Sequence, residues 1–259
     1  MEAVPDESVD LVITSPPYHV SGFTCRPDYS DYDDSQGIDE WEALMEEVFS
    51  ELFRVTKPDA KVCMVLGTSK SSDERFRQHR LAAHAYNLGR NAGFDYLDGV
   101  VWTKNNFANA GGRDRPLFGS YPYPTNMLIT QNHEQILVFR KWIDEEYYSN
   151  REIPKKGSET RESSRLEKEE WREYAQSHWE IEPVKNGKHP AQFPVELATR
   201  LIKLYSFTGD TVLDPFCGAG TTAVAAVQEG RHYCGYDLSA EYCELARERI
   251  SRIDEERGS

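Results

Sequence analysis

Residues 209–222 read Gly-Asp-Thr-Val-Leu-Asp-Pro-Phe-Cys-Gly-Ala-Gly-Thr-Thr. The apolar residues 211–213 predict a short buried strand that ends at Asp214. Gly218 and Gly220 suit a turn whose backbone takes positive φ or passes close to a ligand. A helix is expected to open at Thr221, and its first turn would favour an anionic group such as a carboxylate. This order of strand, turn and helix predicts an α/β fold with a ligand site at the turn.

The next apolar stretch strengthens this interpretation. Residues 232–236 predict a second strand, which ends in Asp237. This acid follows the glycine turn by about twenty residues, the spacing at which a carboxylate can accept hydrogen bonds from ribose hydroxyls. Each acid also has a structural alternative, because Asp214 could cap the turn that follows it and Asp237 could cap the last helix.

A second motif, Thr-Ser-Pro-Pro-Tyr at residues 14–18, follows the apolar run 9–13. Ser15 offers a hydroxyl oxygen, and Pro16 and Pro17 have carbonyl acceptors but no N–H groups. Tyr18 adds a flat aromatic face. Together these groups could hold a planar ring that carries an exocyclic amine. The alternative is an ordinary turn at the end of a strand, where prolines are common.

As a pair, residues 14–18 and 214–222 resemble the amino-group DNA methyltransferases, which use S-adenosylmethionine to methylate cytosine N4 or adenine N6. The catalytic motif precedes the cofactor motif here, as in the permuted β group of that family. Residues 54–60 and 188–194 also agree with the family pattern. The resemblance covers most of the chain except roughly residues 142–180, and it implies a Rossmann-like methyltransferase fold.

The resemblance also implies roles for individual residues. The catalytic residues would be Ser15, Pro16, Pro17 and Tyr18. Of these, the Ser15 hydroxyl and the Pro16 carbonyl would accept hydrogen bonds from the target amine, and Tyr18 would stack on a base rotated out of the duplex. S-adenosylmethionine would contact Asp214, Phe216, Cys217, Gly218, Gly220, Thr221, Thr222, Asp237, Phe193 and Pro194. No metal is expected, because transfer is a direct displacement.

The target base is predicted less directly. Serine in the first motif position resembles the N4-cytosine enzymes more than the adenine enzymes, which often carry Asp or Asn there. We therefore predict a cytosine-N4 DNA methyltransferase, with an adenine-N6 enzyme as the alternative. A methyltransferase for a small molecule or a protein would share the glycine turn and Asp237, and a non-catalytic DNA-binding relative is a further alternative.

Composition sets the limits of this interpretation. The chain has 259 residues, of which 39% are hydrophobic, enough for one sizeable α/β domain. No apolar run reaches membrane-spanning length and no signal peptide precedes the first strand. The five cysteines lack metal-binding spacings, so we expect reduced thiols in a cytoplasmic protein. Cys217 is expected to be a packing residue, because amine methylation needs no covalent intermediate.

The net charge of −14 is unusual for a protein that binds DNA, since such proteins usually present a basic surface. The acidic residues could lie away from the DNA, or the protein could work in a salty cytoplasm where surface charge is screened. Either way, tight nonspecific binding to DNA is not expected.

The order of apolar segments predicts a doubly wound, mostly parallel sheet with helices on both faces. Six strands of parallel type are expected at 9–13, 62–66, 97–103, 135–140, 211–214 and 232–236. Helices are expected at 41–55, 79–92, 192–206 and 239–253, and a charged helix near 164–177. The family resemblance implies a seventh strand before Met1, and the chain would begin inside the helix that follows it. That strand would wall the adenine, so we expect this chain to bind the cofactor weakly.

We divide the chain into a catalytic half (1–141), a target-recognition region (142–186) and a cofactor-binding half (187–259). The stretch 104–126 is basic, glycine-rich and aromatic, and its Lys104, Arg113 and Arg115 are the expected contacts to DNA. An ordinary surface loop is the alternative there, as a solvated charged helix is for 142–186. Residues 19–40 could close over a base or form an acidic loop. The expected partners are double-stranded DNA and a cognate restriction endonuclease; the oligomeric state is not predicted.

Overall fold

The computed structural model describes residues 1–17, 37–70, 78–104, 132–146, 156–184 and 192–258. Within these residues, seven strands form one sheet in the order β7-β5-β6-β2-β1-β8-β9. The strands are β1 (Val9–Thr14), β2 (Thr56–Leu66), β5 (Asp95–Thr103), β6 (His133–Arg140), β7 (His178–Glu180), β8 (Thr211–Asp214) and β9 (His232–Gly235). A separate hairpin pairs β3 (Thr68–Lys70) with β4 (Gln78–Arg80).

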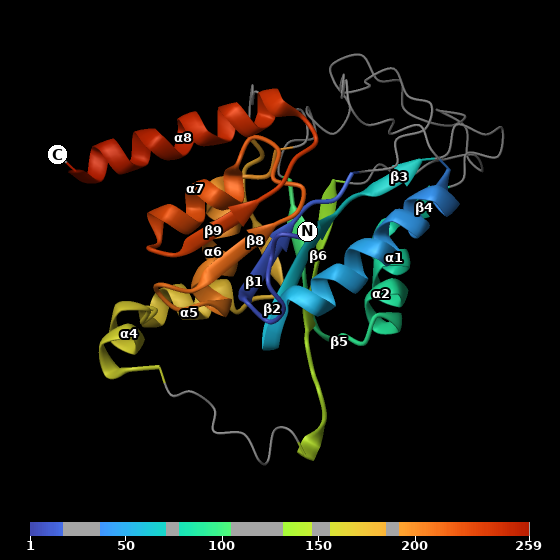
Figure 1. Ribbon diagram of the computed structural model, residues 1–259, viewed down its shortest axis with the longest axis horizontal. Helices are drawn as coiled ribbons and strands as arrows, with labels where there is room; N and C mark the ends of the chain where they lie inside the picture. Colours follow the sequence, from blue (N-terminus) through green and yellow to red (C-terminus); the bar gives the residue numbers. More distant parts are fainter. Residues whose placement is uncertain (18–36, 71–77, 105–131, 147–155, 185–191, 259) are drawn as a thin grey trace, which may run out of the picture.

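Helices cover both faces of the sheet, which confirms the predicted doubly wound α/β architecture (Figure 1). The described helices are α1 (Ile38–Val55), α2 (Leu81–Asn91), α4 (Ser158–Ser163), α5 (Lys168–Tyr174), α6 (Val195–Tyr205), α7 (Thr221–Gln228) and α8 (Ala240–Gly258). One face carries α1 and α2, and the other carries α6 and α7, against which α8 packs. No helix in this part of the chain combines the length and apolar character needed to cross a membrane.

The alternation of apolar residues along β2 explains how one strand serves both layers. Val62, Met64 and Leu66 join the core under α1 and α2, whereas Cys63 and Val65 join the core under α6 and α7. Successive side chains of a strand point to opposite faces, so a continuous apolar run is buried on both sides. This pattern is the reason that the sequence indicated a sheet enclosed by helices.

Strand direction and number differ from the prediction in two respects. All six predicted strands are present, but β6 runs antiparallel to its neighbours β2 and β5. A seventh strand, β7, pairs in parallel with β5 through Trp102 and Trp179. It was missed because three residues carry too short an apolar pattern to be distinguished from a loop. Four of the six strand pairings are parallel, so the mostly parallel character is confirmed.

The described chain also lacks two features expected near its start. The helix expected at residues 1–5 does not form, because the Val4 N–H bonds to the Met1 carbonyl at 3.0 Å and closes a turn. Val4 nevertheless lies in the core with 7% of its surface exposed. The strand expected to wall the adenine is not among the described residues, and β9 forms that edge of the sheet. The seventh strand β7 lies at the opposite edge.

Two of the predicted helices have different limits. The helix expected from residue 79 starts at Leu81, because Gln78–Arg80 pair with β3. The single charged helix expected near 164–177 is instead divided into α4 and α5. Helix α5 begins with a capping box in which Glu167 and Glu170 satisfy each other's backbone N–H groups. This box sets the start of α5 four residues later than the charge pattern suggested.

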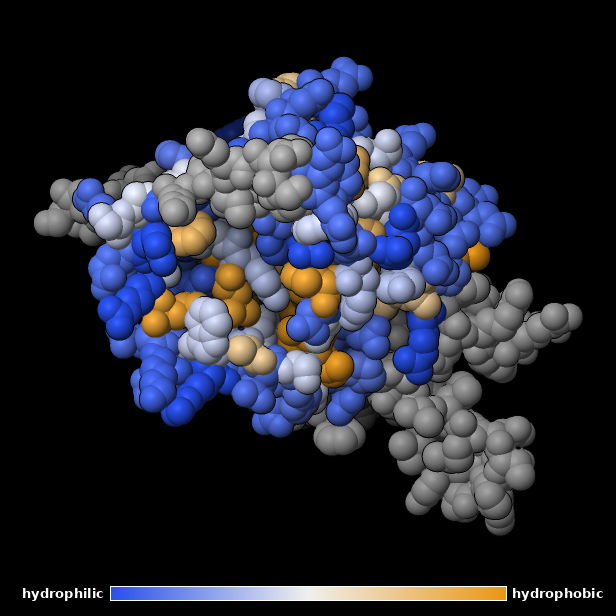
Figure 2. Space-filling view, turned by 90° about the horizontal axis from the view of Figure 1, so that it is seen from below, coloured by the Kyte–Doolittle hydropathy of each residue, from blue (hydrophilic) through white to orange (hydrophobic). Residues whose placement is uncertain are grey.

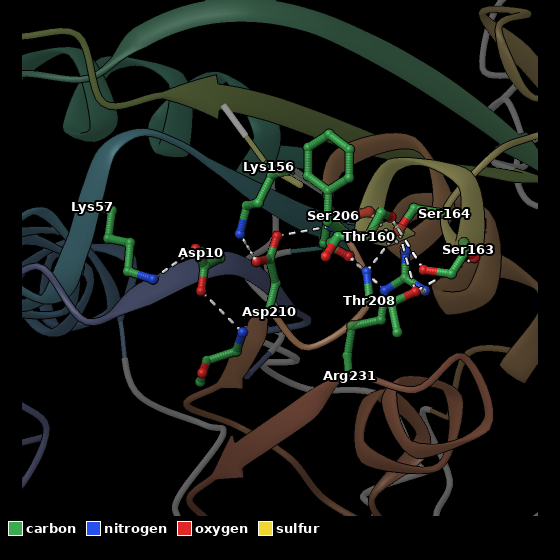
Figure 3. Close-up of polar contacts among 12 residues, drawn as sticks. Asp10, Lys57, Lys156, Thr160, Ser163, Ser164, Ser206, Thr208, Asp210 and Arg231 are labelled. Carbon is green, nitrogen blue, oxygen red and sulfur yellow. Dashed lines mark hydrogen bonds and ion pairs between the residues drawn. The ribbon is translucent and has the colours of Figure 1, made fainter. Parts of the chain in front are cut away.

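The region 142–186 is held at the amino ends of the strands (Figure 3). Lys156 forms an ion pair with Asp210, the residue before β8. The Ser164 hydroxyl accepts a hydrogen bond from the Thr208 N–H at 2.8 Å, and Thr208 also lies 3.4 Å from the Arg231 guanidinium. Helices α4 and α5 therefore lie away from the carboxyl ends of β1 and β8.

Figure 2 views the molecule from the side where these amino ends lie. Hydrophilic side chains cover most of that surface, with hydrophobic residues in separate groups among them. Asp10, at the start of β1, binds the Lys57 ammonium at 2.7 Å and the Thr211 N–H at 3.0 Å. These contacts join three strand starts, so this edge of the sheet is closed by its own polar contacts.

Candidate active site

The two sequence motifs meet at the carboxyl edge of the sheet. Strands β1 and β8 are parallel neighbours, with Leu11 beside Val212 and Val12 beside Leu213. The Thr14 hydroxyl, at the end of β1, donates a 2.6 Å hydrogen bond to Asp214 Oδ1 at the end of β8. Both residues are buried. The chain that leaves β1 toward Ser15 therefore starts beside the glycine turn, although the motifs are far apart in sequence.

Asp214 is held by three donors. Besides Thr14, it accepts hydrogen bonds from the Thr222 hydroxyl at 2.7 Å and from the Phe216 N–H at 3.1 Å. Burial raises the pKa of Asp214 to about 6, although these hydrogen bonds lower it. Such a donor set satisfies a carboxylate, which accepts hydrogen bonds through both oxygens. In this geometry Asp214 caps the turn, as the structural alternative proposed, and also connects β1 to α7.

The glycine turn has one position that tolerates no side chain. Gly220 precedes α7 with φ of 75°, a left-handed conformation, and an added Cβ would lie 2.6 Å from the Ala246 Cβ. Gly220 therefore allows α8 to approach the turn. Gly218 also has positive φ, and its N–H donates to Asp237 Oδ2 at 2.8 Å. No side chain caps the start of α7.

Asp237 connects the glycine turn to the last helix. One oxygen accepts the Gly218 N–H, and the other accepts the Ser239 N–H at 2.9 Å, near the start of α8. Ser239 Oγ in turn lies 3.4 Å from the Tyr242 N–H, as expected of the predicted N-cap. Each carboxylate oxygen keeps a second lone pair. Asp237 thus combines the structural alternative with capacity to accept hydrogen bonds from a ligand.

Residues 15–17 follow β1 directly. Ser15 is half-buried and Pro16 is buried. The Pro17 carbonyl accepts a 2.8 Å hydrogen bond from the indole N–H of Trp41 in α1, so this carbonyl is already paired within the protein. Tyr18 lies outside the described residues. Of the expected acceptors, Ser15 and Pro16 lie between the Thr14 contact and the Trp41 contact.

The other residues expected near the cofactor have mixed placements. Thr221 Oγ1 accepts a 2.8 Å hydrogen bond from the Gln192 amide, which brings the segment before α6 to the start of α7. Phe193 is buried in the core under α6, 7% exposed, and Pro194 precedes that helix. The Thr222 hydroxyl faces Asp214 and the Ile13 carbonyl, inside the protein.

Cys217 is positioned by the backbone of the turn. Its N–H donates to the Tyr236 carbonyl at 2.8 Å. Burial raises the pKa of the Cys217 thiol well above its usual range, and the nearby carboxylates of Asp214 and Asp237 raise it further. The thiol therefore stays protonated, in agreement with a packing role rather than a nucleophilic one.

Among the expected contacts to DNA, Lys104 is described and Arg113 and Arg115 lie outside the described residues. The Lys104 ammonium forms an ion pair with Glu134 and lies 4.6 Å from the centroid of the Trp102 ring. The Lys104 N–H bonds to the Asn132 carbonyl at 2.9 Å, which joins the two ends of the segment 105–131. This segment therefore leaves from the carboxyl end of β5, at the same edge as Thr14 and Asp214.

Three residues of the site are not predicted from sequence. The sequence places Thr14 in a motif without a role of its own, and it indicates only packing for Trp41. Gln192 carries no predicted role. Only Thr14 has a local signal, because a polar residue at the end of an apolar strand needs a buried partner. The contacts of Trp41 and Gln192 join distant segments, which no local pattern indicates.

Comparisons with known proteins agree with this arrangement. The family model described as DNA methylase, of the N6/N4 methyltransferases, matches residues 9–248. A type II methyltransferase, M.MthZI of Methanothermobacter thermautotrophicus, is 28% identical over 97% of this chain and 74% of its own length. Another, M.MjaI of Methanocaldococcus jannaschii, is 29% identical over 96% of this chain and 88% of its own.

Solved structures share the fold. A DNA modification methylase of Thermus thermophilus, in complex with S-adenosyl-L-methionine, has 33% sequence identity and a TM-score of 0.74. The match covers 97% of this chain and 88% of that one. The cytosine-N4-specific PvuII DNA methyltransferase has a TM-score of 0.65 at 18% identity, covering 96% of this chain and 82% of its own. The fold is therefore Rossmann-like, as in methyltransferases.

Proposed function

The chain belongs to the DNA methylase family of N6/N4 methyltransferases, which use S-adenosylmethionine, and on this premise we propose that it methylates N4 of cytosine in double-stranded DNA. The observation that carries the proposal is the contact between Thr14 and Asp214, because it joins the serine-proline motif to the glycine turn. Membership of a DNA methylase family sets aside small molecules and proteins as substrates. The choice of cytosine rests on Ser15.

The residues after β1 suit a weakly nucleophilic amine. The lone pair of an exocyclic amine is delocalised into the base, so acceptors for both of its N–H groups favour a more tetrahedral nitrogen. We assign these acceptors to the Ser15 hydroxyl and the Pro16 carbonyl. Pro17 is not assigned this role, because its carbonyl is bound by Trp41. Positioning would supply most of the rate enhancement.

The residues of the glycine turn fit the cofactor. Its anionic carboxylate suits the start of α7, where no side chain caps the helix and no acidic residue occupies the first turn. The second lone pairs of Asp237 suit ribose hydroxyls, and the Gly218 backbone lies beside them. When bound, S-adenosylmethionine supplies an electrophilic sulfonium methyl group. We assign Asp214 to holding the turn against β1 rather than to direct contact.

We propose that DNA lies along the carboxyl edge of the sheet. The segment 105–131, with Arg113 and Arg115, starts and ends at this edge. The described helices of region 142–186 lie by the amino ends of the strands, so we assign them no contact with the target base. A restriction endonuclease of the same recognition sequence remains our proposed functional partner.

Nucleoside analysis tests this proposal. The chain is expressed in a host without DNA methylation, and its genomic DNA is hydrolysed and analysed by mass spectrometry. We expect N4-methylcytosine with the wild-type chain and a strong reduction with Ser15→Ala or Asp237→Ala. Finding only N6-methyladenine would overturn the choice of base but not the family. An absence of any methylated base from cells that contain folded protein would overturn the proposal itself.

A further inference from the structure

Trp41 connects helix α1 to the residues that follow β1. Its indole N–H donates a 2.8 Å hydrogen bond to the Pro17 carbonyl, across 24 positions of sequence. Trp41 is 1% exposed and packs in the core under α1 and α2. The bond is therefore shielded from water, and the donor lies on a helix whose position is fixed by packing.

The chemistry of the motif explains why such a bond matters. Pro16 and Pro17 have no backbone N–H, so this part of the chain can be held to the fold only through its carbonyls and side chains. Thr14 holds the start of the segment through Asp214, and Trp41 holds its end. The two groups assigned to the target amine, Ser15 Oγ and the Pro16 carbonyl, belong to the residues between these two contacts.

We propose that Trp41 is a positioning residue for methyl transfer: its indole N–H fixes the Pro17 carbonyl and thereby orients Ser15 and Pro16 toward the target amine. This inference rests on the proposed function of the same site. Trp41 touches neither the base nor the cofactor in this account. Its loss should lower the rate of transfer at saturating substrate, because misplaced acceptors weaken the transition state more than substrate binding.

The alternative is that Trp41 only fills the core. Trp102 in β5 offers a matched comparison, because it is also 1% exposed and its indole N–H also donates at 2.8 Å to a carbonyl, that of Ile181. Strands β6 and β2 separate β5 from β1, so this second bond does not touch the serine-proline motif. Replacing each tryptophan by phenylalanine removes an indole N–H and a similar volume at the two places.

The experiment compares Trp41→Phe with Trp102→Phe in the full chain. Thermal unfolding and the Kd for S-adenosylmethionine measure the fold, and kcat and KM for duplex DNA are measured at saturating cofactor. We expect both variants to lose similar stability and to bind the cofactor within about twofold of wild type. Only Trp41→Phe should lose roughly tenfold in kcat, the effect of one misplaced hydrogen bond, with little change in KM.

Equal values of kcat for the two variants would overturn the inference. If Trp41→Phe does not fold, benzothienylalanine at position 41 keeps the bicyclic shape and lacks the N–H group. The same roughly tenfold fall in kcat is expected with it, and wild-type kcat would contradict the inference. A wild-type chain that transfers no methyl group would instead refute the proposed function, so the two failures are distinguishable.

Discussion

The Thr14 hydroxyl donates a 2.6 Å hydrogen bond to the Asp214 carboxylate, although 200 positions of sequence separate the two residues. Thr14 precedes the residues assigned to the target amine, and Asp214 precedes the turn assigned to the cofactor. Asp214 also accepts the Thr222 hydroxyl, at the start of α7. Two strand ends and one helix start are thus joined at a single buried carboxylate.

This carboxylate should make stability depend on pH. In the folded protein the pKa of Asp214 is raised from 3.8 to about 6, so the folded state binds more protons than the unfolded chain between these values. The contribution of Asp214 to the free energy of unfolding therefore falls as the pH rises through this window and is constant above it. The fall is at most about 3 kcal/mol, since one pKa unit corresponds to about 1.4 kcal/mol.

Urea unfolding of wild type and Asp214→Asn across this pH range measures the effect. Asparagine does not titrate, so the advantage of wild type over the variant should shrink as the pH rises from about 4 to about 6. Subtracting the variant removes the contributions of other acids. A difference that stays constant, or grows with pH, would show that the pKa of Asp214 is not raised by folding.

Gly220→Ala should destabilise the protein by about 3 kcal/mol, because it combines a left-handed φ with a clash against Ala246. Gly209→Ala is the control, since Gly209 has φ of 82° but no atom within 4 Å of an added Cβ. It should lose only about 1 kcal/mol from backbone strain. Adding Ala246→Gly to Gly220→Ala should recover the difference in urea unfolding; no recovery would mean that the clash is not the cause.

Ser15→Ala should lower kcat by roughly 10²-fold, because the target amine loses one hydrogen-bond acceptor during transfer. Ser15→Thr keeps the hydroxyl and serves as the conservative comparison, which should retain more activity than alanine. Single-turnover transfer of a tritiated methyl group to duplex DNA measures both variants. A fully active Ser15→Ala would exclude the hydroxyl from the reaction.

The basic residues should differ in their contributions to DNA binding. Arg113→Ala and Arg115→Ala should each reduce the slope of log K against log salt by about 0.9, the value for one lost phosphate contact. Lys104→Ala should change the slope less, because Glu134 already pairs with its ammonium. Fluorescence anisotropy with a labelled duplex over a range of salt concentrations measures this. Unchanged slopes in both arginine variants would remove residues 104–126 from the proposed DNA interface.

Much of the fold could be predicted from local patterns. The apolar strands 9–13, 62–66 and 211–214 are central in the sheet, and buried strands carry strong signals. The direction of β6 and the existence of β7 could not be predicted, because pairing partners are set by tertiary packing and not by the strand's own residues. The start of α2 likewise depends on the hairpin between β3 and β4.

The site was predicted by residue type more than by contact. Gly218 and Asp237 were chosen for their spacing, and they bond to each other at 2.8 Å. The roles of Thr222 and Phe193 differ from expectation, because the side chain of one faces Asp214 and the other is buried under α6. Side-chain direction depends on neighbours brought from elsewhere in the chain. For the same reason the contact between Trp41 and Pro17 left no trace in the sequence.

A double-mutant cycle on Thr14 and Asp214 tests most directly whether the two motifs act as one site. The kcat/KM for methyl transfer to duplex DNA is measured for wild type, Thr14→Val, Asp214→Asn and the double variant, after each is shown to be folded. Joined motifs predict that the double variant loses little more than the worse single variant, with a coupling energy of about 1–3 kcal/mol. Losses that simply add would contradict the account, because the hydrogen bond between these residues would then contribute nothing to the reaction.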